Sequence, residues 1–202
     1  EDVRGLLVSG ARSIATLTGG LRRGDGQGDV AQLDGRDAWL ACWDGRVVAT
    51  GPADDVQILL DDAGLPLDQF ARLDAADGLV TPGLVDPHTH LLFAGSREKE
   101  LLLRQRGAGY LEILAAGGGI LSTVAATRRA SRDVLLAHGR RWLGEMLAHG
   151  TTTIEAKSGY GLDLATELRL VDVAYRLGEE GPIDVVPTFL GAHAVPEEFR
   201  GR

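Results

Sequence analysis

A single cysteine, Cys42, is present among the 202 residues of this sequence. One thiol excludes an intramolecular disulfide and is typical of a protein kept in a reducing cytoplasm. We interpret Cys42 as a small buried apolar residue rather than a reactive one, because it lies within the apolar run AWLACW at residues 38–43.

Long apolar runs and an excess of positive charge are missing as well. No stretch reaches 18 consecutive apolar residues, and no basic segment followed by an apolar one opens the chain, so neither a membrane span nor a secretion signal is expected. The formal net charge of -8 argues against nucleic acid or an acidic membrane as a partner, because both bind basic surfaces. These absences predict a soluble, cytoplasmic protein.

The first 75 or so residues are predicted to be rich in β-structure. Short apolar segments lie near residues 5–8, 39–43 and 47–50. The pair Asp44-Gly45, between the last two segments, is typical of a hairpin turn. Residues 19–35 are rich in glycine and charge but lack the Gly-Lys-Ser/Thr ending of a phosphate-binding loop, so we interpret them as a surface loop.

From residue 79 onward, the pattern alternates between strands and helices. Strands are predicted at residues 79–90, 151–154 and 183–190. Helices are predicted at residues 98–116, 132–149 and 163–177, the last with Asp163 as its N-cap. The apolar stripe of the second helix consists of Val134, Leu135, Trp142, Leu143, Met146 and Leu147. Repeated strand–helix units predict an α/β fold with a parallel sheet and helices outside it.

Two histidines close the first of these strands, in the segment PGLVDPHTH at residues 82–90. In a strand, His88 and His90 would point to the same face while Thr89 points away. Their α-carbons would lie roughly 6.5 Å apart, close enough for both imidazoles to bind one metal ion at about 2.0–2.1 Å. Two surface histidines in a loop are the alternative, but the apolar strand that precedes them favours a metal site.

Polar residues of catalytic type also follow the strands, where parallel α/β enzymes build their active sites. Arg97 could clamp a substrate carboxylate, or it could form a surface ion pair with Glu98 or Glu100. Tyr160 lies between two glycines in a loop, which is consistent with a ligand-facing phenol or with a packed ring. His193 follows the apolar end of the third strand, as either a site residue or a structural histidine.

Lys157 and His149 have simpler interpretations. In binuclear hydrolases of this general architecture, a strand-end lysine modified by CO₂ bridges two metals. The strand that precedes Lys157 is the wrong one for that role, so we favour an ion pair with Glu155 or a role in fixing the loop. His149 lies at the carboxyl end of a predicted helix, where the helix dipole favours a positive charge.

With these segments assembled, the chain resembles the amidohydrolase superfamily, and within it the imidazolonepropionase family. The superfamily resemblance rests on LVTPGLVDPHTH at residues 79–90. The narrower resemblance rests on HLLFAGSREKE at 90–100, YLEI at 110–113, GGGI at 117–120, EAKSGYG at 155–161 and TFLGAHA at 188–194. These segments occur in order over more than half of the chain, whereas residues 1–75 match only loosely.

The resemblance implies a fold and an activity. Residues 76–202 would form the first three βα units of a TIM-type (β/α)₈ barrel, preceded in residues 1–75 by part of a small β-sandwich domain. The implied reaction is metal-dependent hydrolysis of 4-imidazolone-5-propanoate to N-formimidoyl-L-glutamate in histidine degradation. The partner is therefore a small-molecule substrate, and a homodimer is a further expectation.

The resemblance also implies roles for particular residues. His88 and His90 would be two ligands of one divalent metal ion, either zinc or iron. Arg97, Tyr160 and His193 would contact the substrate, with the guanidinium of Arg97 suited to the propanoate group. Tyr110 is a weaker candidate for the same pocket.

The length of the chain limits these expectations. A (β/α)₈ barrel needs about 250 residues, so three βα units look like the front part of a longer enzyme. The remaining metal ligands and the acid/base residue are then expected beyond residue 202, and the isolated chain is expected to be inactive. Two alternatives stay open: another amidohydrolase, acting on a different cyclic amide or a heterocyclic base, and a non-catalytic fragment.

Overall fold

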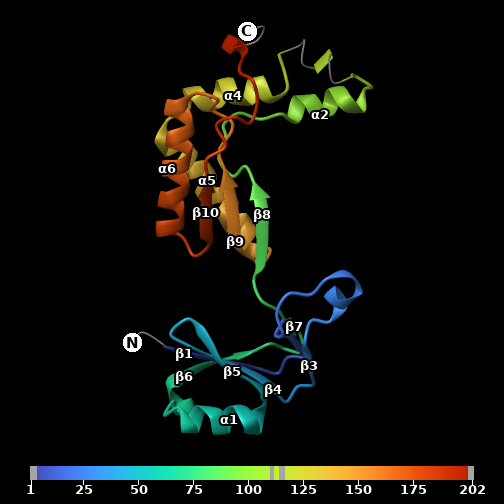
Figure 1. Cartoon of the computed structure of the whole chain (residues 1–202), viewed down its shortest axis with the longest axis vertical. Coiled ribbons are helices and arrows are strands. Elements are labelled where there is room, and N and C mark those ends of the chain that lie inside the picture. Colours follow the sequence, from blue (N-terminus) through green and yellow to red (C-terminus); the bar gives the residue numbers. More distant parts are fainter. Residues whose placement is uncertain (1–3, 110–111, 114–116, 200–202) are drawn as a thin grey trace. The chain divides into compact units, whose positions relative to one another are not determined.

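The computed structural model describes residues 4–109, 112–113 and 117–199. It has a mixed α/β architecture, in which the chain folds as two compact units, Glu1–Pro82 and Gly83–Arg202 (Figure 1). Within the described ranges, no helix has both the length and the hydropathy needed to cross a membrane. Each unit is built around sheets of its own.

The larger sheet of the first unit forms where the sequence predicts β-structure. It consists of β5 (Arg46–Pro52), β4 (Ala38–Trp43), β1 (Gly5–Ser9) and β6 (Phe70–Asp74), in that order. Asp44 and Gly45 connect β4 to β5 with φ angles of 48° and 74°, and a two-residue type I′ hairpin turn requires such positive angles. Helix α1 (Ala53–Asp62) buries Val56 and Leu60 in the core beneath this sheet.

Two predictions for the first unit need adjustment. Cys42 is partly rather than fully buried, because β4 places Ala41 in the core and the next side chain on the opposite face. Residues 19–35 are largely exposed, as expected of a surface loop, but they also contain a 3₁₀ turn, Gly24–Gly28, and the short strand β3 (Gln32–Asp34). That strand pairs with β2 (Ser13–Ala15) in a second, smaller sheet.

The predicted strand over residues 79–90 is in fact two strands. β7 (Leu79–Val80) pairs in parallel with β2 in the first unit, whereas β8 (Leu84–Thr89) begins the sheet of the second unit. Pro82 lies between them, and proline has no amide hydrogen to donate to a neighbouring strand. The apolar pattern continues across the break, so it conceals the change of sheet. His90 follows β8 directly.

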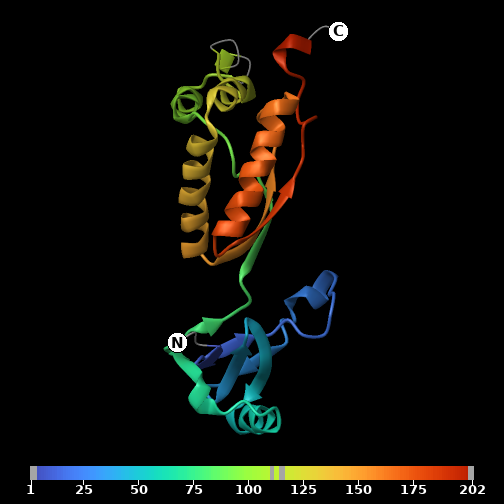
Figure 2. The same cartoon turned by 90° about the vertical axis from the view of Figure 1, so that its left-hand side faces the viewer.

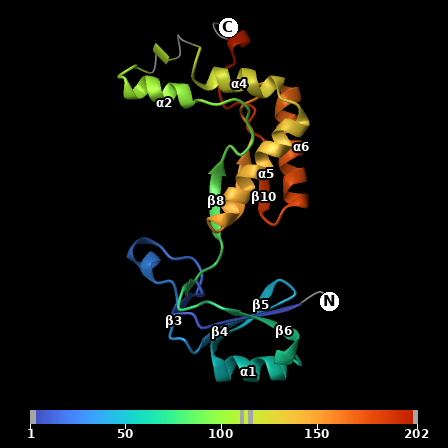
Figure 3. The same cartoon turned by 180° about the vertical axis from the view of Figure 1, so that it is seen from behind.

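The second unit contains the parallel sheet that the sequence predicts. β8, β9 (Thr151–Lys157) and β10 (Asp184–Thr188) run in the order β10-β9-β8. β9 is longer than predicted, so Glu155 and Lys157 lie within it rather than after it. Helices α5 (Arg132–Ala148) and α6 (Leu164–Glu180) lie side by side against this sheet (Figures 2 and 3). Their shared core includes Leu92, Leu135, Leu143, Ile154, Leu170, Val173 and Leu177.

Apolar side chains also remain on surfaces that these helices do not cover. Val85 on β8 is 63% exposed and Val186 on β10 is 54% exposed. Of the predicted apolar stripe of α5, Leu135 and Leu143 are buried, but Val134 and Trp142 are exposed. The stripe prediction is therefore correct for one side of the helix only.

The segment between β8 and α5 departs most from prediction. α2 (Glu98–Gln105) ends well before the predicted residue 116, and part of the remainder, residues 110–111 and 114–116, lies outside the described residues. An unpredicted helix, α4 (Ile120–Arg129), follows and buries Thr127, whose hydroxyl accepts a hydrogen bond from the Ala94 amide at 3.0 Å. The predicted N-cap of α6 is confirmed, since the Asp163 carboxylate accepts a hydrogen bond from the Thr166 amide at 2.8 Å.

Candidate functional site

The two histidines at the end of β8 lie on the same side of the chain. The centroids of the His88 and His90 rings are 6.0 Å apart. The hydroxyl of Thr89, between them, donates a hydrogen bond to the Glu155 carbonyl of β9 at 2.7 Å. This contact turns Thr89 toward the neighbouring strand. His88 is exposed and His90 is half-buried.

His90 is enclosed by other rings of the predicted site. Its ring centroid lies 4.7 Å from that of Tyr160 and 4.6 Å from that of His193. Its buried Nδ1 has no hydrogen-bond partner among the described residues. Burial, followed by the nearby imidazoles of His193 and His88, lowers the pKa of His90, which favours the neutral form that can bind a metal ion.

A metal ion fits this pair of imidazoles as a partial ligand set. Two rings whose nitrogens each lie about 2.0–2.1 Å from one ion have centroids within roughly 6.5 Å of each other, a limit that His88 and His90 satisfy. In the part of the chain that the structure describes, however, no group of three or more histidine, cysteine or acidic side chains is placed to hold a metal. Further ligands would have to come from elsewhere.

Two loops bring Tyr160 and His193 to this end of the sheet. Tyr160 lies in the loop after β9, and His193 lies in the segment after β10. The loops are tied together by a hydrogen bond from the Leu190 amide to the Ser158 hydroxyl at 2.9 Å. The ring centroids of Tyr160 and His193 are 5.9 Å apart. Residues more than 30 positions apart in the sequence thus form one aromatic and imidazole cluster.

Arg97 forms one of the two contacts that its position in the sequence left open, the ion pair, and it also lines a cavity. Its Nε and Nη2 donate to Oε2 of Glu100 at 2.9 and 2.6 Å, so the ion pair forms with Glu100. The other oxygen of Glu100 accepts from the Gly119 amide at 2.7 Å. Arg97 also lines a cavity of about 530 Å³ together with His90, Phe93, His138, Trp142 and Tyr160. His88 and His193 are not among the residues that line it.

Sequence comparison with known proteins places this chain in a family. The chain is 47% identical over 197 residues to an imidazolonepropionase of Symbiobacterium thermophilum and 49% identical over 202 residues to one of Bacillus velezensis. An imidazolonepropionase of Myxococcus xanthus is 45% identical over 205 residues. The alignments cover 98%, 99% and 100% of this chain, respectively. The chain belongs to the imidazolonepropionase family. It spans about 45% of the length of these relatives.

Other comparisons are weaker than the likeness to imidazolonepropionases. No family model matches the chain. A triazine hydrolase structure from Arthrobacter aurescens superposes with a TM-score of 0.45 at 17% sequence identity, covering 92% of this chain and 35% of that one. A mutant of the chlorohydrolase TrzN from the same organism, complexed with zinc and atraton, gives a TM-score of 0.44 at 19% identity, covering 91% and 35%.

In this member of the imidazolonepropionase family, one side of the cavity is formed by residues of α5 that were not predicted from the sequence as part of the site. His138 on α5 stacks edge-on against Phe93, with ring centroids 4.5 Å apart, and its Nε2 is buried without a hydrogen-bond partner among the described residues. Burial, then the charge of Arg141, lowers the pKa of His138. Trp142 lies one helical turn further along and lines the same cavity. The spacing of His138 and Trp142, at positions i and i+4, is the signal that could have paired them.

Three other predictions concern Lys157, His149 and Tyr110. Lys157 forms the expected ion pair with Glu155, whose Oε1 also accepts a hydrogen bond from the Thr188 hydroxyl at 2.6 Å. His149 caps α5, and its Nδ1 lies 2.7 Å from the Glu145 carbonyl oxygen. Tyr110 lies outside the described residues.

The ion pair between Arg97 and Glu100 leads to a prediction about pH. The Arg97 guanidinium holds the pKa of Glu100 below its ordinary value of about 4.3. A carboxylate whose pKa is lower in the folded state stabilises the fold above the unfolded-state pKa, and this stabilisation is lost as the pH falls through the folded-state pKa. Urea unfolding of the chain should therefore show Glu100→Gln to be destabilised relative to wild type at pH 7, with the difference shrinking below about pH 4. A difference that is constant from pH 7 to pH 3 would contradict the ion pair.

Proposed function

We propose that this chain is part of a metal-dependent hydrolase that opens the ring of 4-imidazolone-5-propanoate to give N-formimidoyl-L-glutamate. The proposal is carried by the convergence of His90, Tyr160 and His193 at one end of the parallel sheet, beside a cavity that Arg97 lines. The relatives' name, imidazolonepropionase, supports this choice of substrate over other cyclic amides.

His88 and His90 would hold one divalent metal ion, either zinc or iron. The buried Nδ1 of His90, which has no hydrogen-bond partner among the described residues, and the lowered pKa of this histidine suit a neutral imidazole ligand. Such an ion, when bound, supplies Lewis acidity that lowers the pKa of a coordinated water to about 7 and polarises a carbonyl group. The remaining ligands would come from outside the described residues.

The side chains around the cavity would bind and orient the substrate. The planar guanidinium of Arg97 suits the propanoate carboxylate, and Glu100 holds that guanidinium in place through two hydrogen bonds. Tyr160 would hold the imidazolone ring against the histidines, so that attack becomes effectively intramolecular. His193 would donate a hydrogen bond to the ring carbonyl and to the oxyanion that develops from it.

We propose an architecture to match. Residues 76–202 would be the first part of a (β/α)₈ barrel, and residues 1–75 part of a composite β-sandwich. The parallel order of β8, β9 and β10 supports this arrangement. The exposure of Val85 and Val186 supports it too, because apolar side chains on strands are usually covered by further structure.

A chimera tests the activity. In it, this chain replaces the matching segment of the Bacillus velezensis relative, to which it is 49% identical over 202 residues. Hydrolysis of 4-imidazolone-5-propanoate is followed beside that of a cyclic amide without a carboxylate. The expected result is turnover of the propanoate substrate with strong preference over the other. A folded chimera that hydrolyses both equally well, or only the second, would overturn the proposed function.

Substitution of Arg97 by alanine should mainly raise KM. A hydrogen-bonded ion pair with the propanoate contributes about 1.5–3 kcal/mol, so KM should rise roughly 10- to 100-fold while kcat changes little. Glu100→Gln is the matched control, because it weakens the same internal ion pair and keeps the guanidinium. An Arg97→Ala chimera with the kinetics of wild type would remove Arg97 from the substrate site.

A further inference from the structure

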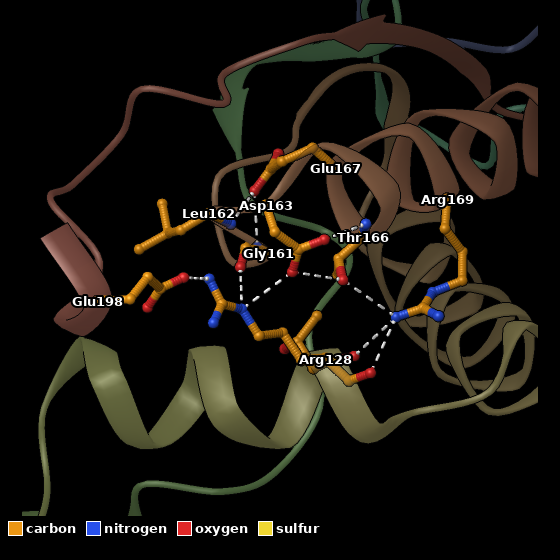
Figure 4. Close-up of polar contacts among 9 residues, drawn as sticks. Arg128, Gly161, Leu162, Asp163, Thr166, Glu167, Arg169 and Glu198 are labelled. Carbon is orange, nitrogen blue, oxygen red and sulfur yellow. Dashed lines mark hydrogen bonds and ion pairs between the residues drawn. The ribbon is translucent and has the colours of Figure 1, made fainter.

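The carboxylate of Glu167 lies buried at the start of α6. In the described part of the chain, its hydrogen bonds come from three backbone amides. Glu167 is 1% exposed. Oε2 accepts a hydrogen bond from the Gly159 amide at 2.8 Å, and Oε1 accepts from the Gly161 and Leu162 amides, each at 2.7 Å. Figure 4 shows the carboxylate reaching back from the helix to this loop.

Helix capping does not explain this arrangement. The N-cap of α6 is already provided by Asp163, which accepts from both the amide and the hydroxyl of Thr166. In a capping box the glutamate would return to the N-cap amide, whereas Glu167 reaches past the N-cap to residues 159–162. A buried carboxylate is costly unless it is fully hydrogen-bonded, and here three N–H groups compensate for that cost.

The loop that Glu167 holds has an unusual backbone. Gly159 has φ of 119° and Leu162 has φ of 54°, and residues other than glycine rarely adopt such backbone angles. Local sequence preference alone would not keep the loop in this conformation. The three hydrogen bonds from its backbone amides to Glu167 oppose its relaxation to a less strained one. The carboxylate therefore stabilises the backbone conformation of residues 159–162.

This loop sets the position of two side chains of the proposed site. Tyr160 lies between the bound amides, and its ring centroid is 4.7 Å from that of His90. Gly159 lies directly against His193: a Cβ at Gly159 would come within 2.8 Å of the His193 Cβ. Any change in the path of the loop at these positions moves both rings relative to His90.

A second group of bonds holds the same loop from the opposite side. The Nε of Arg128, on α4, donates to the Gly161 carbonyl at 2.6 Å and pairs with Asp163 at 3.0 Å. Its Nη2 pairs with Glu198 at 2.8 Å, which joins the segment after β10 to the same arginine (Figure 4). These contacts are less buried than those of Glu167, so they support the loop without replacing the carboxylate.

We propose that Glu167 is a positioning residue, which holds Tyr160 and His193 against His90 by fixing the backbone of residues 159–162 for binding of the substrate ring. The placement of the rings is a property of the chain itself. The consequence for catalysis rests on the function proposed above.

Amide exchange and ring contacts measured by NMR on the 202-residue chain test the placement. Glutamine is nearly isosteric with glutamate but has one acceptor oxygen, so Glu167→Gln turns an NH₂ group toward one of the two sets of amides. We expect the protection of that set, Gly159 or Gly161 with Leu162, to fall roughly 10- to 100-fold, and the ring contact between Tyr160 and His90 to weaken. Glu167→Asp keeps the charge but is one methylene shorter, and should disturb all three amides.

Glu180→Gln is the matched control, because Glu180 is a carboxylate of the same helix engaged in surface ion pairs with Arg140 and Arg176. It should change none of these signals. Unchanged protection at residues 159, 161 and 162 in both Glu167 variants, or unmoved ring contacts despite lost protection, would overturn the proposal.

Kinetics of the chimera separate positioning from mere structural support. A positioning role predicts that Glu167→Gln lowers kcat/KM at least 10-fold for the folded enzyme, with kcat affected as well as KM, at temperatures well below unfolding. A structural role alone would lower the melting temperature and leave kcat/KM of the folded enzyme unchanged, which would count against the proposal. Failure of the wild-type chimera to act on the propanoate would instead contradict the proposed function, and the NMR result would still decide the placement of the rings.

Discussion

Substitution of His88 by alanine should abolish retention of the divalent metal by the chimera. The rings of His88 and His90 are the one pair of imidazoles that β8 delivers together, with centroids 6.0 Å apart. In the proposed metal centre, removing either ring would leave a single ligand from this chain, and a centre that loses one of its few protein ligands binds its ion far more weakly.

Metal content after dialysis is the measurement for this prediction. The wild-type chimera should keep close to one zinc or iron ion per chain, and His88→Ala and His90→Ala should keep almost none and lose activity in parallel. His149→Ala is the control, because His149 caps α5 through its contact with the Glu145 carbonyl and should retain the full metal content. A His88→Ala protein with the metal content of wild type would exclude His88 as a ligand.

Substitution of Gly159 by alanine should have the largest effect on stability. A Cβ at this position would lie 2.8 Å from the His193 Cβ, 3.0 Å from its Cγ and 3.2 Å from the Leu190 carbonyl oxygen. The His193 Cβ is attached directly to the backbone and the Leu190 oxygen is part of it, so neither atom can move away easily. The φ of 119° adds strain for any residue with a side chain. Overpacking and backbone strain together should lower the free energy of unfolding by about 3 kcal/mol.

Urea unfolding of the chain measures this loss, and Gly144→Ala is its control. Gly144 lies within α5 with open space around its Cα, so alanine there should raise the stability by about 0.5–1 kcal/mol. The loss at Gly159 should be accompanied by displacement of the His193 ring. A Gly159→Ala chain as stable as wild type would show that the loop does not press against His193 as described.

The sequence was a good guide to the second unit because its elements follow local rules. Asp163 is a strong N-cap, and the apolar residues after it recur with the spacing of a helix. The start of α6 was therefore predicted closely. The β-branched run that begins at Thr151 identified β9, but not its extension through the polar residues Glu155 and Lys157. Those side chains are tolerated in the strand because they pair with each other.

Local rules failed where tertiary pairing decides the structure. Nothing in residues 79–90 distinguishes a strand that changes sheet at Pro82 from one that continues, because both sides of the break are apolar. Helix α4 was missed because its sequence, ILSTVAATRR, is rich in β-branched residues, which weakens a helix signal. It is stabilised by packing and by the contact of the Thr127 hydroxyl with the Ala94 amide.

The sequence motifs pointed to the residues of the candidate site, but not to the helix residues that hold or surround them. His88, His90, Tyr160 and His193 stand out because reactive side chains follow apolar strands, and the parallel sheet then brings those strand ends together. Glu167 and His138 lie on helices, where a carboxylate or an imidazole usually faces solvent. Only the fold shows that Glu167 turns inward to backbone amides and that His138 lines the cavity.

In the proposed site, the end of β8 presents two neighbouring imidazoles, His88 and His90, to the same ion. A crystal of the chimera, with diffraction data collected at the zinc and iron absorption edges, tests this arrangement. The account predicts one anomalous peak at about 2.0–2.1 Å from a ring nitrogen of both His88 and His90. A metal peak that only one of these rings contacts, or that lies away from both, would contradict it.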